Sequence, residues 1–121
     1  MRAIFFAIVV AIATLGSAPS FATDERNVTV VNATGYAIKF LGFNPPGDDD
    51  WDDNELSSPL ADKASVYVKF NRADEGCNWN IRVDWADEDS GVLWKNVNLC
   101  KIDVITLHYD RTSDTTSFTA K

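Results

Sequence analysis

Apolar and polar residues alternate along most of this chain with the two-residue period of a β-strand. The alternation is clearest at 78–85, where four apolar side chains share one face: Trp79, Ile81, Val83 and Trp85. Shorter alternating stretches predict strands at 27–31, 36–43, 65–70, 92–98, 103–109 and 115–120. Seven strands separated by turn residues predict one all-β domain. We expect a single small antiparallel β-sandwich, with a small barrel as the alternative.

Local signals add detail to this strand pattern. The turn residues at 32–35 predict a hairpin between the first two strands, and Ile38 and Phe40 share a face of the second. The alternation of the fifth strand slips near Asn96, which predicts a β-bulge. The segment 44–63 is the one long connection. A loop of that length in so small a domain is usually functional.

The N-terminal segment has a different pattern from the rest of the chain. Arg2 precedes an uncharged apolar run at 3–15, and 20–22 has the small-x-small form of a signal-peptidase site. The run is short for a membrane span, and no basic cluster follows it. We therefore expect residues 1–22 to be a cleaved signal peptide and residues 23–121 to be the exported, periplasmic β-sandwich domain.

The chain is acidic, with 18 Asp and Glu against 11 Lys and Arg, a formal charge of −7 and a pI of about 4.5. A nucleic-acid binder needs a basic surface to neutralise phosphates, and this composition argues against one. Removal of the signal peptide takes away Arg2 and no acid, so the exported domain is more acidic still. The acids are also unevenly spread, because one third of them lie within 48–55.

The chain has two cysteines, Cys77 and Cys100. Two cysteines in an exported protein most simply form one disulfide. A redox pair is the weaker interpretation, because the chain has no C-x-x-C motif and no basic cluster near either thiol. We predict a structural disulfide whose closed loop stabilises the fold by about 3 kcal/mol.

The sequence offers little for catalysis or for soft metals. His108 is the only histidine, no serine lies in a nucleophile-elbow motif, and most acids lie in turns and loops. We therefore expect no enzymatic activity. Copper(I) and structural zinc favour thiolates, thioethers and imidazoles, which are scarce here. Carboxylate oxygen is abundant, and it is the ligand that Ca²⁺ and the similarly sized lanthanide(III) ions prefer.

The acidic loop, residues 44–55, is the main candidate for such a site. Its predicted metal ligands are Asp48, Asp49, Asp50, Asp52, Asp53 and Glu55. Asp48, Asp50 and Asp52 copy the opening spacing of an EF-hand, but Asp53 stands where that loop has its glycine, so this is not an EF-hand. A bound cation would relieve the repulsion among these carboxylates. The alternative is a solvated charged segment that binds nothing.

Two further features are weaker candidates. Asp84, Asp87 and Asp89 could form a second metal site, although a polar hairpin turn already explains these residues. Trp51 stands alone among the acids of the loop. It either anchors the loop on the sandwich or displays its ring to a ligand, and we favour the loop anchor.

Three motifs carry a family resemblance: Asn-Ala-Thr-Gly at 32–35, Asp-Asp-Trp at 49–51 and Trp-x-x-Val-Asn-Leu-Cys at 94–100. With these, the chain resembles small exported bacterial β-sandwich proteins of the LanD-like, periplasmic lanthanide-binding type. The resemblance covers nearly the whole exported domain and carries over no individual ligand. It implies a periplasmic carrier or chaperone for a hard cation, which passes the ion to another periplasmic metal-binding protein.

Three functional hypotheses follow. The first is a protein that binds a lanthanide or Ca²⁺ through the acidic loop; a single loop fills few of the coordination positions of a large ion, so a metal-linked homodimer is a related hypothesis. The second is an acidic interaction module that docks a basic partner without metal. The third is a weak enzyme or a carbohydrate-binding sandwich that uses the ring of Trp51 as a platform.

Overall fold

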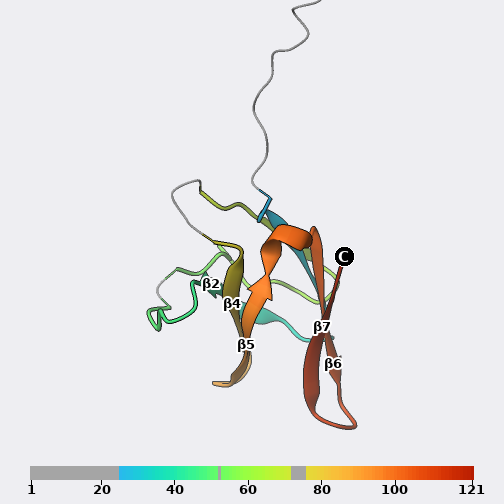
Figure 1. Ribbon diagram of the computed structural model, residues 1–121. Coiled ribbons are helices and arrows are strands. Elements are labelled where there is room, and N and C mark those ends of the chain that lie inside the picture. The colour runs from blue at the N-terminus through green and yellow to red at the C-terminus, as the bar shows by residue number, and fades with distance from the viewer. Residues whose placement is uncertain (1–24, 52, 72–75) are drawn as a thin grey trace, which may run out of the picture.

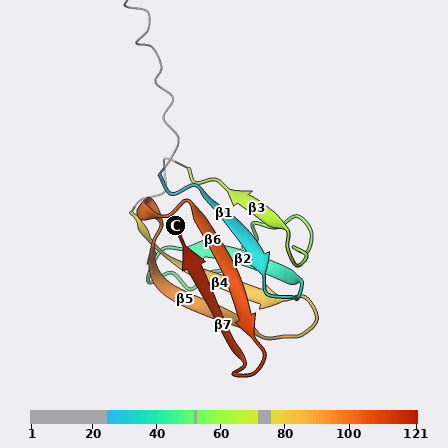
Figure 2. The same cartoon turned by 90° about the vertical axis from the view of Figure 1, so that its right-hand side faces the viewer.

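The computed structural model describes residues 25–51, 53–71 and 76–121, and it confirms an all-β sandwich of two packed sheets. One sheet has the strand order β3-β1-β6-β7, with β1 (Val28–Ala33), β3 (Ser65–Val68), β6 (Val104–Asp110) and β7 (Thr115–Ala120). The other has the order β2-β4-β5, with β2 (Ile38–Asn44), β4 (Asn78–Trp85) and β5 (Gly91–Asn98). Figure 1 shows β2, β4 and β5 facing β6 and β7, and Figure 2 shows the four-stranded sheet in front. The predicted signal peptide lies outside the described residues.

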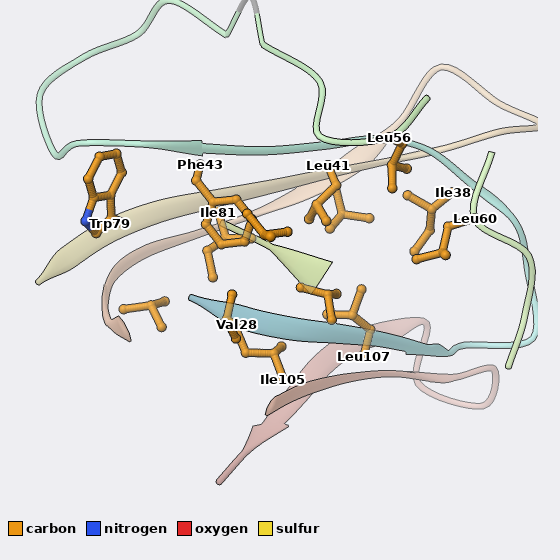
Figure 3. Close-up of a cluster of buried hydrophobic side chains, with 14 of the residues drawn as sticks. Val28, Ile38, Leu41, Phe43, Leu56, Leu60, Trp79, Ile81, Ile105 and Leu107 are labelled. Carbon is orange, nitrogen blue, oxygen red and sulfur yellow. The ribbon is translucent and has the colours of Figure 1, made fainter. Parts of the chain in front are cut away.

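The core lies between the two sheets, where the predicted alternation places it (Figure 3). All four apolar residues of the clearest predicted strand are buried, with Trp85 the most exposed of them at 9%. From the facing sheet, Val28, Ile105 and Leu107 are each at most 1% exposed. Burial of side chains of this size supplies most of the driving force for folding.

The predicted hairpin between the first two strands is wrong. β1 and β2 belong to different sheets, and the short connection between them crosses the sandwich. Both edges of β1 are occupied, one by β3 and the other by β6, so that no edge is left for β2. The turn itself forms as predicted, with Gly35 at a φ of +91°, and it supports a crossing as readily as a hairpin.

One strand pair departs from the predicted antiparallel arrangement. β1 and β6 are parallel, and Thr29 to Ala33 pair with Val104 to His108 in register. The other four strand pairs are antiparallel. The parallel pair follows from topology, because β6 comes back to β1 only after the chain has built the whole opposite sheet.

Two bulges alter which side chains face the core. The predicted bulge near Asn96 is confirmed: the β4–β5 register shifts there, and Asn96 takes a φ of +56°. A second shift between Ile38 and Phe40 in β2 overturns the prediction that these two share a face. Ile38 is 1% exposed, whereas the ring of Phe40 lies 5.3 Å from the guanidinium of Arg82 on the outer face.

The predicted disulfide between Cys77 and Cys100 is confirmed, with the two Cα atoms 5.3 Å apart. It joins the start of β4 to the short 3-10 helix η1 (Leu99–Lys101). Among the described residues, no helix is long and apolar enough to cross a membrane.

The long connection between β2 and β3 packs along the open edge of β2. Ile38 forms an isolated β-bridge with Leu60, through hydrogen bonds of 2.8 and 3.0 Å. Leu56 and Leu60 insert into the core and are 9% and 7% exposed. The connection thereby covers an edge strand that would otherwise present unpaired backbone groups.

Candidate functional site

The acidic loop projects from the β2 edge of the three-stranded sheet (Figure 1). An asparagine side chain holds each of its ends. Asn44 donates from Nδ2 to the carbonyl oxygens of Asp50, at 2.6 Å, and Asp48, at 3.3 Å. Asn54 donates to the carbonyl of Lys39 at 2.8 Å and accepts from the backbone N–H of Leu41 at 3.1 Å. Both ends of the loop are therefore fixed to the rigid sheet.

Within the loop, a tight turn presents the first aspartates. The backbone N–H of Asp48 donates to the carbonyl of Pro45 at 3.1 Å, and Gly47 takes a φ of +92°, which favours glycine. The carboxylate of Asp48 accepts from the backbone N–H of Asp50 at 2.9 Å. One Asp48 oxygen therefore has a structural role within the loop.

The predicted ligands occupy exposed positions. Asp52 lies outside the described residues; the exposed ones are Asp48, Asp49, Asp50, Asp53 and Glu55. No three His, Cys, Asp or Glu side chains in 25–51, 53–71 or 76–121 are grouped so as to hold one metal ion.

Trp51 is half-buried against the outer face of the three-stranded sheet. A Cβ at Gly42 would lie 3.1 Å from the Trp51 ring and 2.6 Å from the Phe40 ring, so both rings pack over a glycine. The guanidinium of Arg82 lies 6.0 Å from the Trp51 ring centroid, within the range of a cation–π contact. These contacts agree with the loop-anchor interpretation.

A shallow cavity of about 480 Å³ lies beside Trp51 on the same face. Its lining includes Lys39, Arg82 and Asp84. Because positive charges and a carboxylate share this surface with the ring, it is the place where the third hypothesis, a carbohydrate platform, would act.

The three aspartates of the second predicted metal site have different surroundings. Asp84 makes a bidentate pair with Arg82, with N···O distances of 2.9 and 3.1 Å. Asp89 lies 3.6 Å from the ammonium group of Lys39, and Asp87 lines a different cavity at the end of the sandwich. Two of the three carboxylates therefore already have a cationic neighbour.

Comparison of the chain with protein-family models, with curated proteins and with solved structures finds no match. Sequence reasoning missed the roles of Asn44 and Asn54, although asparagine beside a turn is a known signal for side-chain to backbone hydrogen bonds.

Proposed function

We propose that this protein is a periplasmic carrier or chaperone for a hard cation, a lanthanide(III) ion or Ca²⁺, which it binds through the acidic loop. The chemistry of the loop supports this, because oxygen is the ligand that such ions prefer and six carboxylates lie within eight consecutive positions. Mutual repulsion of these charges disfavours a compact loop, and a bound cation would reverse that cost.

The observation that carries the proposal is the fixation of both loop ends by Asn44 and Asn54. A free acidic tail would lose much conformational entropy on closing around an ion. A loop with fixed ends loses less, since only the residues between the two asparagines must be ordered.

The loop cannot by itself surround a large ion, which takes six to eight or more oxygens. Water, a small anion or a second copy of the chain would fill the remaining positions. The last case gives a metal-linked homodimer. The positions that the loop leaves unfilled are also positions that an accepting periplasmic protein could fill during transfer of the ion.

Terbium luminescence tests the proposal, because Trp51 lies within the loop and can sensitise bound Tb³⁺. We expect a luminescence gain at micromolar Tb³⁺ and its loss in the double variant Asp49→Asn, Asp53→Asn. The matched control is Asp103→Asn, Asp110→Asn, which makes the same charge change away from the loop. Equal signals from the two double variants, or no gain in the natural sequence, would reject the loop as the site. Light scattering during the titration reports dimer formation.

The second candidate is an acidic module that docks a basic partner without metal. It is favoured by the absence of three grouped carboxylates among the described residues. Binding of a short oligolysine peptide, measured with and without a chelator, separates the two candidates. Docking through exposed charge survives the chelator and weakens steeply between low and physiological salt, whereas a chelated trivalent ion survives the salt.

A further inference from the structure

The end of the sandwich opposite the disulfide contains a cavity of about 560 Å³. Three aromatic residues line it: Tyr36 in the connection before β2, Trp85 at the end of β4 and Tyr109 in β6. The β4–β5 and β6–β7 turns, which lie at the bottom of Figure 1, contribute Asp87, Glu88 and Asp114. This cavity is separate from the acidic loop, which lies at the side of the molecule (Figure 1).

The three rings pack against one another edge to face. The centroid of Tyr36 lies 6.5 Å from that of Trp85 and 5.7 Å from that of Tyr109, with interplanar angles of 74° and 79°. The ring centroids of Trp85 and Tyr109 are 6.2 Å apart, and the interplanar angle is 65°. Three aromatic rings therefore meet at this cavity, and an aromatic ring attracts a cation that lies within about 6 Å of its centroid.

The charged residues that line the cavity are acidic, while Arg111 lies close enough to Tyr109 to act on the pKa of its phenol. Among the described residues that line the cavity, three carry a carboxylate and none carries a positive charge. The Tyr109 hydroxyl donates to Asp114 at 2.8 Å, which fixes the orientation of that ring. The same hydrogen bond raises the pKa of Tyr109 above its ordinary value.

We propose that this cavity binds a small free organic cation that carries a quaternary ammonium group, of the choline type. Such a group has no N–H to donate, so aromatic faces are better partners for it than a ring of hydrogen-bond acceptors. The carboxylates at the rim add long-range attraction, and they reject ligands that carry an anionic group. A metal ion would need oxygen ligands in place of the rings.

Choline titration followed by NMR of the tryptophan indole N–H groups tests this proposal. The chain has four tryptophans, and Trp85 is the one in the cavity. We expect its indole signal to shift with a dissociation constant in the millimolar range, while the signals of Trp51, Trp79 and Trp94 stay in place. The neutral isostere 3,3-dimethylbutan-1-ol should bind at least about tenfold more weakly. Glycine betaine, whose carboxylate meets the acidic rim, should also bind more weakly.

Variants at the tyrosines locate the site without disturbing the core. Tyr36 is 39% exposed, so Tyr36→Leu should leave the fold intact and weaken choline binding about three- to tenfold. Tyr67, which is 51% exposed on β3, provides the matched control Tyr67→Leu and should have no effect. Asp114→Asn should also weaken binding. It is conformationally tolerated, because asparagine accepts the positive φ of 53° at this position.

Several results would overturn the proposal. Equal binding of choline and its neutral isostere would show only an apolar cavity. No shift of the Trp85 indole at tens of millimolar choline, or equal losses in Tyr36→Leu and Tyr67→Leu, would reject the site. Phosphatidylcholine vesicles carry the same head group, and sedimentation of the protein with them would assign the ligand to a lipid. Loss of Tb³⁺ binding in the loop variants has no bearing on these outcomes.

Discussion

Asn32 is the buried polar centre that holds the crossing between the two sheets, and its replacement should be severely destabilising. Its side chain is fully buried. Nδ2 donates to the carbonyl oxygens of Tyr36, at 2.8 Å, and Leu60, at 3.0 Å. Oδ1 accepts from the backbone N–H and the hydroxyl of Thr34, at 3.0 and 2.7 Å. One amide therefore ties together the end of β1, the start of β2 and the long connection.

The cost of Asn32→Ala follows from the partners that remain. The Leu60 carbonyl still accepts from the N–H of Ile38, and the Tyr36 carbonyl still accepts from the Thr34 hydroxyl. Three hydrogen bonds of Asn32 are lost, those to the Leu60 and Tyr36 carbonyls and that from the Thr34 hydroxyl, and each loss costs about 0.5 kcal/mol. The buried N–H of Thr34 is left without its acceptor, which costs about 1 to 3 kcal/mol. We expect a total loss of about 3 kcal/mol, or a fall in Tm of about 15 °C.

Urea unfolding followed by circular dichroism measures this loss, with an unchanged m-value as the sign that only the stability has changed. The control is Asn98→Ala, which removes a single exposed hydrogen bond to the N–H of Cys100 and should cost about 0.5 to 1 kcal/mol. Asn32→Asp should lose at least as much as Asn32→Ala, because it buries a charge that faces two carbonyl oxygens. Equal losses for Asn32→Ala and Asn98→Ala would show that the buried amide contributes no more to stability than the exposed one.

Three further predictions concern single contacts. Reduction of the disulfide should lower the free energy of unfolding by about 3 kcal/mol in urea titrations with and without reductant. Gly91→Ala should cost about 1 to 3 kcal/mol by the same assay, because its Cβ would clash with the carbonyl oxygen of Val83. Asp114→Asn should lower the pKa of Tyr109 toward 10.0 in an ultraviolet titration, since the hydrogen bond from the phenol to this carboxylate is the main cause of the raised value. In the natural chain the stabilising effect of this bond is present below about pH 10 and is lost as the pH rises through the raised pKa of Tyr109.

The period of the hydrophobic residues determined the secondary structure and the core of this protein. Alternation along 78–85 placed Trp79 and Val83 in the core, because successive side chains of a strand must point to opposite faces. The slip at Asn96 was also visible in the sequence, since an extra residue reverses the order of inward and outward positions. The two cysteines predicted their disulfide because no other pairing within the chain is available to them.

The tertiary structure alone decided how the strands pair and which polar residues are buried. A turn at 32–35 is compatible with both a hairpin and a crossing, and the occupation of both edges of β1 selects the crossing. Arg26 looks like an ordinary surface residue in the sequence, yet it is 7% exposed and lies 5.5 Å from the Phe70 ring. The contacts among the rings of Tyr36, Trp85 and Tyr109 depend on the same long-range pairing. Residues so far apart along the chain come together only when both sheets form, and no local pattern encodes such a meeting.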